Sequence, residues 1–410
     1  MAAHNCERDL ASLAGEGSIF GGSAAEKLER LQAELAPLSC RYDVVVANPP
    51  YMGAKNMNSW LSSWVKKQYA DVKGDLFSCF MVRNSGMGTD HAQMGFMTPY
   101  VWMFIGTYEK LRRFVIEQNT ITSLIQLEYS GFAGATVPIC TFTLQKGKVE
   151  GYKGGCIRLF DFPGADQQAP RALEALADPS CGWFYRADAD GFGAIPGSPI
   201  AYWISLRMID SFKHGISVND ISDYTGSQNI TANNEVYLRR WWEVNNISHR
   251  WLMYSKGGNF RRWYGNYDYV VDWSESARWF YKNNPTSNLL KEQYWFQEGV
   301  TYSDITSGKS HFRFFPAKGV FDKKGPVICK LGSKLMPLLA FLNSSLCQQY
   351  LSLLNPSMTL QVIDVKNIPL NTGIFESDKI DEIAKENVAL SRVDYDSYEL
   401  SCNFTKHPLI

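Results

Sequence analysis

The sequence predicts an α/β fold in which part of a Rossmann-like sheet is followed by a mixed α/β domain. Strand-like and helical segments alternate over residues 42–148, as in βαβ units. Residues 149–216 are rich in Gly, Pro, Ala and Asp, which indicates a connector, whereas residues 217–376 are β-prone and aromatic. A chain of 410 residues is long enough for two or three domains. A helical lead-in (residues 1–41) and a charged helical tail (residues 377–410) complete the expected organisation.

The composition is that of a globular protein. Hydrophobic residues make up 45% of the chain, and 41 basic side chains balance 41 acidic ones, so only a local attraction to nucleic acid is expected. No stretch approaches the roughly 20 apolar residues that span a bilayer, and residues 1–10 lack the apolar core of a secretion signal. Nine scattered cysteines form no C-x-x-C pair. We therefore expect a cytoplasmic protein with reduced thiols, no metal and no membrane association.

The elements of the first half follow from hydrophobic periodicity. Residues 24–35 have helical spacing. Tyr42–Ala47 is a continuous β-branched run, which predicts a strand buried on both faces, as in a parallel sheet. Further helices are expected at 57–69, 75–84 and 100–118, and further strands at 95–97, 121–127 and 137–145. No helix separates the last two strands, so they should form an antiparallel pair at the edge of the sheet.

The second half has weaker signals. Short strands are expected within the connector at residues 156–160 and 183–186. Helical patterning returns at residues 333–343 and 345–354, and residues 360–369 resemble a closing strand. The tail from residue 377 has the pattern of an amphipathic helix.

The segment Asn48-Pro49-Pro50-Tyr51 directly follows the first expected strand. Its two prolines end that strand, so the chain turns at the carboxyl end of a buried strand, where open α/β sheets bind ligands. The Asn48 amide oxygen and a backbone carbonyl outside any ladder can together accept both hydrogens of one amino group. Tyr51 adds a flat face suited to stacking on a planar base. A plain Pro-Pro turn is the alternative interpretation.

A basic and aromatic stretch in the second half points to nucleic acid. Between residues 239 and 263, six basic residues face one acidic residue, Glu243, which gives a local charge of +5. A second basic patch lies at residues 311–318. The candidate DNA-binding residues are Arg239, Arg240, Lys256, Arg261, Arg262, Arg313 and Lys318. The sequence does not distinguish residues that contact bases from residues that contact phosphates. The alternative interpretation of this stretch is an arginine-rich sheet face that is exposed to solvent and binds no DNA.

Residues 42–51, continued by MGAKNMN, resemble motif IV of the γ-type adenine-N6 DNA methyltransferases, and more closely the PglX-type methyltransferases of BREX phage-defence systems. The resemblance covers roughly residues 24–369. It implies that residues 42–148 are the carboxyl-terminal part of a methyltransferase fold and that residues 217–376 are a DNA target-recognition domain. Segments similar to that domain are 225–229, 237–244, 256–266, 299–303 and 307–308.

The resemblance also implies roles for individual residues. Asp75-Leu76-Phe77 is similar to a segment that packs beneath the active site, residues 95–98 to the next strand, and Gly131-Phe132 to motif VIII. Asn48, Pro49, Pro50 and Tyr51 would form the catalytic turn, which holds the adenine amino group, and Tyr51 and Phe132 would stack on opposite faces of the ring. The implied reaction moves a methyl group from S-adenosylmethionine to an adenine extruded from double-stranded DNA by roughly 180°.

The cofactor-binding features of the family have no counterpart in this sequence. The resemblance places a glycine-containing motif I upstream of motif IV, and the 47 residues before Asn48 contain none. The cofactor-binding residues therefore stay unknown, and the chain resembles the carboxyl-terminal part of a longer, truncated or split enzyme. We expect it to be inactive by itself unless the missing amino-terminal segment is supplied in trans.

Two other functions fit the same features. Similar NPPY pockets serve methyltransferases that act on RNA guanine or on protein glutamine, although those enzymes usually lack a large recognition domain. The chain can also be read as a DNA-binding specificity module without catalysis, which acts with other defence-system proteins.

Overall fold

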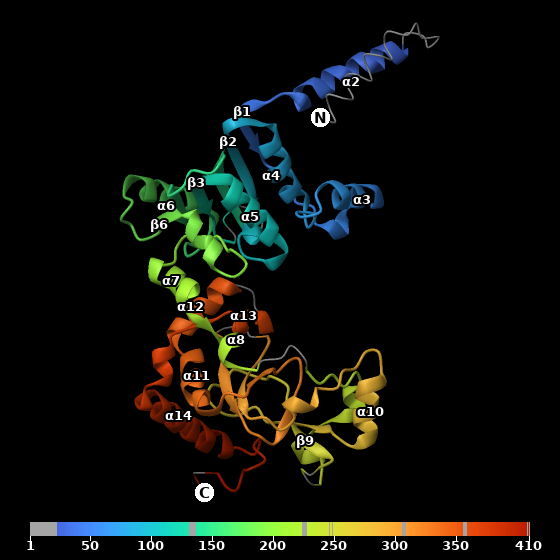
Figure 1. The fold of residues 1–410 in the computed structure, drawn as a ribbon, viewed down its shortest axis with the longest axis vertical. Coiled ribbons are helices and arrows are strands. Elements are labelled where there is room, and N and C mark those ends of the chain that lie inside the picture. Colours follow the sequence, from blue (N-terminus) through green and yellow to red (C-terminus); the bar gives the residue numbers. More distant parts are fainter. Residues whose placement is uncertain are drawn as a thin grey trace. The chain divides into compact units, whose positions relative to one another are not determined.

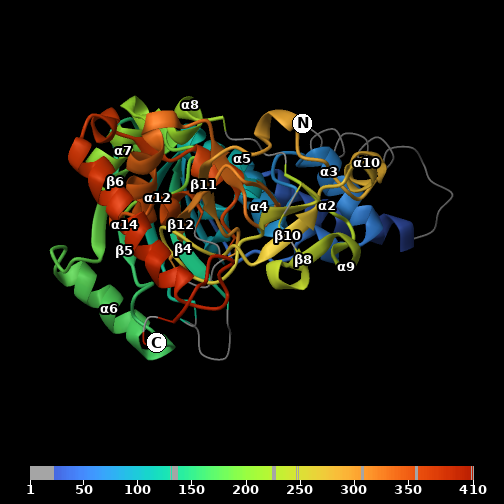
Figure 2. The same ribbon diagram turned by 90° about the horizontal axis from the view of Figure 1, so that it is seen from below.

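In the computed structural model, the described residues are 23–129, 131, 137–223, 228–245, 247, 249–305, 309–355, 359–407 and 409. The chain divides into two compact units, Met1–Ser205 and Leu206–Ile410, each of which is described by itself (Figures 1 and 2). Both units mix helices with strands. The α/β fold class expected from the sequence is confirmed.

Unit 1 is built on a six-stranded mixed sheet with the order β1-β2-β4-β3-β5-β6. Two ladders are parallel, β1 with β2 and β3 with β5, and the other three are antiparallel. The strands are β1 (Tyr42–Ala47), β2 (Gly88–Pro99), β3 (Asn119–Gln126), β4 (Ile139–Lys146), β5 (Lys153–Arg158) and β6 (Phe184–Asp188).

Five helices belong to the described part of unit 1. They are α2 (Ser23–Ser39), α3 (Ser59–Gln68), α4 (Leu76–Met87), α5 (Glu109–Gln118) and α6 (Ala165–Ala177). Short 3-10 turns occur at Ala54–Asn56, Tyr100–Met103, Gly106–Tyr108 and Ala189–Ala194. Polar caps fix two of the helix starts, because the Asn58 side chain accepts a hydrogen bond from Leu61 N and the Asp75 side chain accepts one from Phe77 N. Helices α4 and α5 pack on β2 and β3 (Figure 1).

Strand β1 has the predicted bounds, but its predicted burial on both faces is wrong. The side chains of Val44 and Val46 are 63% and 76% exposed. Val44 and Val46 point to the same face of the sheet, and β1 is an edge strand that pairs only with β2 among the described residues. The apolar run therefore predicts the strand correctly, but it does not predict the position of that strand in the sheet.

The predicted antiparallel pair, β3 and β4, forms but does not lie at an edge. Strand β4 lies between β2 and β3, and the sheet continues through β5 and β6. These two strands come from the stretch predicted as a connector, which also contributes α6. The helix expected at residues 100–118 is shorter, since two 3-10 turns precede α5.

Unit 2 holds three smaller sheets, with the orders β13-β9-β10-β8, β12-β11-β14 and β15-β7. Strands β11 and β12 lie side by side (Figure 2). The strands are β7 (Ile216–Ser217), β8 (Leu238–Arg240), β9 (Trp251–Ser255), β10 (Tyr269–Asp272), β11 (Gly299–Tyr302), β12 (Phe312–Phe315), β13 (Gly319–Phe321), β14 (Val327–Cys329) and β15 (Pro369–Leu370).

Eight helices accompany these sheets in the described part of unit 2. They are α7 (Leu206–His214), α8 (Val218–Ile221), α9 (Asn234–Tyr237), α10 (Glu275–Asn283), α11 (Leu335–Leu342), α12 (Ser345–Leu354), α13 (Val362–Lys366) and α14 (Asp378–Asp396). Short 3-10 turns add Trp241–Glu243, Glu292–Tyr294, Gly332–Lys334 and Thr372–Phe375. Helices α11 and α14 pack together (Figure 1).

Helices α11, α12 and α14 match the helices expected in this region. The closing strand predicted at residues 360–369 is wrong over most of its length. A capping box between Gln361 and Asp364 starts the helix α13, and only β15 at the end of the segment is a strand. Within the ranges described, no helix has the length and apolar character that a bilayer crossing requires.

Candidate active site

The predicted catalytic turn lies at the carboxyl edge of two parallel strands. Ala47, the last residue of β1, pairs with Phe96 of β2. Asn48 therefore leaves the sheet beside the end of β2, at Met97. The carboxyl ends of parallel strands are the usual position of ligand sites in α/β sheets, so the strand order brings together two segments about 50 residues apart in sequence.

Hydrogen bonds hold the turn in one arrangement. The Tyr51 hydroxyl oxygen lies 3.1 Å from Asn48 Oδ1 and 3.2 Å from the Met97 carbonyl oxygen, so the hydroxyl proton can be donated to either. Asn48 and Pro50 are exposed, whereas Pro49 is buried. The Asn48 oxygen is thus oriented from one side by Tyr51, and its second lone pair can accept a hydrogen from a ligand.

The aromatic ring of Tyr51 rests on the core and stays accessible. It meets the buried Phe77 ring edge to face, with centroids 6.5 Å apart and an interplanar angle of 90°. Phe77 packs in turn on Tyr108 at 5.4 Å. The side chain of Tyr51 is 39% exposed. Burial of the remainder raises the pKa of the Tyr51 phenol, so the hydroxyl stays a donor at neutral pH.

Asp75 connects the turn to helix α4. Its Oδ1 accepts hydrogen bonds from Met52 N at 2.9 Å and from Phe77 N at 3.3 Å. Leu76 N donates to the Met52 carbonyl oxygen at 3.1 Å. Burial raises the pKa of Asp75, and the backbone N–H donors oppose that rise. The residues after Tyr51 are therefore held to the start of α4. The packing of Asp75-Leu76-Phe77 beneath the active site, which the resemblance implies, stays a prediction.

Phe132, the second predicted stacking residue, lies outside the described residues, so its place opposite Tyr51 stays a prediction. Neighbouring Gly131 is described, and its N–H donates to the Glu128 carbonyl oxygen at 3.0 Å. The recognition-domain segments 225–227 and 307–308 also fall outside the described part of the chain.

Two exposed tryptophans that follow the turn in the chain were not among the predicted site residues. Trp60 and Trp64 lie one helical turn apart on α3, with rings 6.3 Å apart and nearly parallel at 10°. Trp60 is 71% exposed. Exposed aromatic faces of this kind suit contacts with nucleic-acid bases. Their i, i+4 spacing in an amphipathic segment is the sequence signal that could have identified them.

Carboxylates from distant parts of unit 2 pair with several of the predicted DNA-binding residues. The +5 charge calculated for residues 239–263 is therefore largely neutralised in the fold. The ion pairs are Arg240–Asp268 at 3.1 Å, Arg250–Asp272 at 3.1 Å, Lys256–Asp322 at 2.9 Å and Arg261–Asp394 at 2.9 Å. Arg240 also lies over the Tyr269 ring, 4.1 Å from its centroid.

Arg313 is a correction to the predicted DNA contacts. Its side chain on β12 is 0% exposed, so it offers no surface to a nucleic acid. Its Nη1 donates to the Arg261 carbonyl oxygen at 3.4 Å, and burial lowers the pKa of Arg313 to about 10. Arg313 was predicted as a DNA contact because aromatic residues surround it in the sequence, but that pattern occurs around buried arginines as well as exposed ones.

The three other predicted DNA-binding residues form no ion pair among the described residues. Arg239 donates through Nη1 to the carbonyl oxygens of Glu235 and Leu238 at 2.6 and 2.7 Å. Arg262 lies 5.6 Å from the centroid of the exposed Phe260 ring. Lys318 is exposed just after β12. These three side chains are the better placed ones for a phosphate.

Comparisons with known proteins agree with the geometry. The Eco57I restriction-modification methylase family matches residues 22–132. The adenine-specific methyltransferase PglX of Lacticaseibacillus casei (strain Zhang) is 32% identical over 401 residues, which cover 91% of this chain and 33% of PglX. BrxX of Escherichia coli O9:H4 (strain HS), also an adenine-specific methyltransferase, is 30% identical over 417 residues, which cover 98% of this chain and 33% of BrxX. The chain thus spans about a third of the length of these relatives.

Among solved structures, the Type IIL restriction-modification enzyme MmeI, determined in complex with DNA, has a similar fold. The TM-score is 0.51 at 9% identity, over 91% of this chain and 52% of MmeI. The sequence and fold relationships coincide on the part of the chain that carries the Asn48–Tyr51 turn. The Eco57I restriction-modification methylase model thus matches residues 22–132, and nearly the whole chain is similar to about a third of the adenine-specific methyltransferases PglX and BrxX.

Proposed function

We propose that this chain supplies the adenine-binding and DNA-reading parts of a site-specific adenine-N6 DNA methyltransferase that acts in phage defence or restriction-modification. The observation that carries the proposal is the turn after β1, where Tyr51 orients the Asn48 amide oxygen at the carboxyl edge of parallel strands. Relatives named as adenine-specific methyltransferases support the substrate base. MmeI, which has a similar fold and was determined in complex with DNA, supports DNA as the substrate.

In this proposal the turn binds the amino group of an extruded adenine. Asn48 Oδ1 and the Pro49 carbonyl oxygen accept the two amino hydrogens and draw them out of the ring plane, which localises the nitrogen lone pair. The ring of Tyr51 stacks on one face of the base, and Phe132 covers the other. Extrusion costs a few kcal/mol, and stacking contributes about 1–3 kcal/mol per base. S-adenosylmethionine, when bound, supplies the methyl group.

A further segment completes the cofactor side of the site in this proposal. The 47 residues before Asn48 contain no glycine-rich strand-to-helix turn. Strand β1 lies at the edge of the sheet, and its Val44 and Val46 side chains are exposed. Apolar edge strands are normally paired or covered, which supports the presence of a further segment beside β1. The segment belongs to the same protein or to a second chain of the defence system.

Labelled S-adenosylmethionine tests the proposal. The chain is incubated with duplex DNA, alone and together with the segment that precedes the aligned region in PglX-type relatives. We expect the chain alone to bind duplex DNA, and labelled methyl to appear on adenine only in the mixture. Label on RNA or on protein instead of DNA would contradict the substrate. Transfer by the chain alone would contradict the need for a further segment.

A non-catalytic specificity module is the second candidate, and the missing motif I favours it. In that case the chain binds duplex DNA, and neither the chain nor the mixture binds S-adenosylmethionine in a calorimetric titration. Cofactor binding by the mixture would exclude this alternative.

The Tyr51→Phe variant tests how Asn48 is oriented. Removing one hydroxyl removes the hydrogen bond to Asn48 Oδ1 and keeps the ring that packs on Phe77. A neutral hydrogen bond contributes about 1 kcal/mol, so we expect methyl transfer by the complemented enzyme to fall about fivefold. Single-turnover rates at saturating DNA measure the effect, with unchanged thermal unfolding as the control. An unchanged rate would show that the hydroxyl does not orient Asn48.

A further inference from the structure

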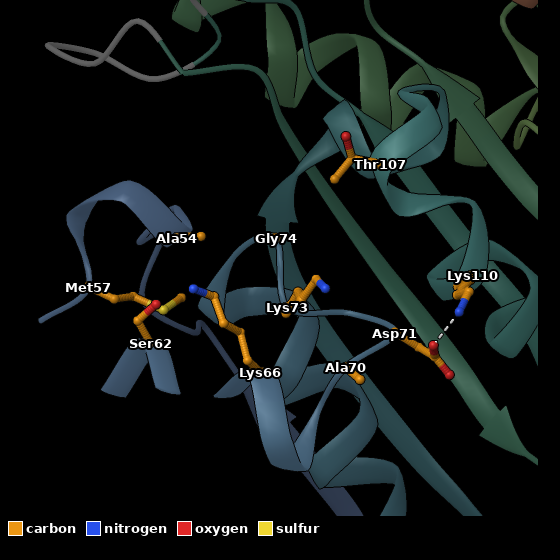
Figure 3. A pocket seen from close by; sticks show the side chains of 10 residues that line it. All are labelled: Ala54, Met57, Ser62, Lys66, Ala70, Asp71, Lys73, Gly74, Thr107 and Lys110. Atoms are coloured by element: carbon orange, nitrogen blue, oxygen red, sulfur yellow. Dashed lines mark hydrogen bonds and ion pairs between the residues drawn. The ribbon is translucent and has the colours of Figure 1, made fainter. Parts of the chain in front are cut away.

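Unit 1 contains a pocket of about 410 Å³ that no predicted site residue lines. Three of its lining residues are lysines from different segments: Lys66 from α3, Lys73 from the α3–α4 connection and Lys110 from α5 (Figure 3). Asp71, which also lines the pocket, forms an ion pair with Lys110. Sequence patterning did not reveal this cluster, because the three lysines are spread over 45 residues.

The pocket carries uncompensated positive charge. Lys66 and Lys73 are exposed and form no ion pair within the described ranges, while Asp71 neutralises only Lys110. The hydroxyl groups of Ser62 and Thr107 add hydrogen-bond capacity to the wall. Ammonium groups along one concave surface, with hydroxyl groups beside them, suit an oxyanion such as a phosphate.

The pocket wall includes a segment that follows the Asn48–Tyr51 turn closely in the chain. Ala54 lines the pocket, and its N–H donates to the carbonyl oxygen of Gly74, another lining residue, at 3.0 Å. Residues 53 and 75 form an isolated bridge beside this bond. Ala54 follows Asn48 by six residues, which an extended chain spans in at most about 20 Å. At about 3.4 Å per nucleotide, the Ala54 part of the pocket wall lies within some six nucleotides of a base held by Asn48.

We propose that this lysine pocket binds backbone phosphate groups of the DNA duplex next to the extruded adenine. The inference rests on the proposed function, since it takes the position of the adenine from Asn48. Phosphate contacts position a protein on DNA without reading sequence. The pocket would therefore fix the register between the duplex and the turn, and extrusion would deliver one particular base to Tyr51.

Charge-neutralising variants with a matched control test this assignment. The variants are Lys66→Gln, Lys73→Gln and the double variant, and the control is Lys67→Gln, an equally exposed lysine next to Lys66 on α3 that does not line the pocket. The affinity of the full chain for a duplex oligonucleotide is measured from about 50 to 200 mM salt. We expect each pocket variant to lower the slope of log K against log[salt] by about 0.9. The control keeps the wild-type slope.

Ethylation interference then places the contact. On wild-type protein, ethylated phosphates within about six nucleotides of the target adenine should weaken binding, and this interference should disappear in the double variant. Slopes and interference patterns equal to those of Lys67→Gln would overturn the pocket assignment and leave the proposed function intact. Wild-type protein that does not bind duplex DNA would instead refute the proposed function itself. Tighter, Lys66-dependent binding of single-stranded RNA would overturn DNA as the ligand.

Discussion

Replacing Asn48 by alanine is expected to lower methyl transfer by the complemented enzyme about 100- to 1,000-fold, with duplex binding unchanged. Asn48 Oδ1 is the oriented acceptor of the turn, and alanine removes it together with its contact to Tyr51. Loss of one pre-organised hydrogen-bonding group aimed at the reacting centre has effects of about this size. Single-turnover rates at saturating DNA measure the change, because they separate the chemical step from binding.

The control variant for Asn48→Ala is Asn56→Ala. Asn56 is exposed in the 3-10 turn Ala54–Asn56, on the same loop, and lies outside the predicted turn. It should keep the wild-type rate. Asn48→Asp, which retains an acceptor oxygen at this position, should keep more activity than Asn48→Ala. Equal loss in Asn48→Ala and Asn56→Ala would assign the effect to the loop and refute the role of the amide oxygen.

The Arg112→Met substitution is expected to destabilise unit 1 by about 3 kcal/mol. Arg112 is fully buried on α5, where Nη1 donates to the carbonyl oxygens of Trp102 and Ile105 at 2.8 and 2.7 Å, and Nε donates to that of Gly197 at 2.8 Å. Burial lowers the pKa of Arg112 to about 10, so it remains charged at neutral pH. Methionine fills a similar volume and leaves three carbonyl groups without this donor.

Hydrogen exchange of the α5 and β3 amides in increasing denaturant measures the stability of unit 1 separately from unit 2. Arg113→Met is the matched control. Arg113 is the next residue on α5, is exposed, and forms a surface ion pair with Glu109 at 3.0 Å. Exposed pairs of this kind contribute less than about 1 kcal/mol, so this variant should be close to wild type. Equal protection in both variants would refute a structural role for the buried guanidinium.

Much of the local structure could be predicted from the sequence. The strand Tyr42–Ala47 and the helices α2, α3, α4, α12 and α14 were located from periodicity alone. The prediction failed where a short apolar segment fits both helix and strand. Residues 362–366 are the example, because the capping box of Gln361 and Asp364 favours a helix over the expected strand.

The sequence predicted the residues of the candidate turn, but it did not predict their contacts with other segments of the chain. The Asn48–Tyr51 turn was identified by its residue types, because two prolines after a β-branched run restrict the backbone locally. Tyr51 of the turn contacts Met97, 46 residues away in the chain, and Met52, the residue after the turn, contacts Asp75, 23 residues away. The lysine pocket could not be predicted for the same reason, since the fold brings Lys66 and Lys110, 44 residues apart in the chain, to the wall of one pocket.

The sequence by itself determined which residues build the turn, where its strand begins and ends, and which family the chain resembles, because these depend on side chains that are neighbours in the chain. Only the tertiary structure decided that β1 is an edge strand with Val44 and Val46 exposed, that Arg313 is buried, and that acidic residues far away in sequence neutralise much of the basic stretch. Strand order and long-range ion pairs depend on the packing of the whole chain, so they cannot be predicted from local composition.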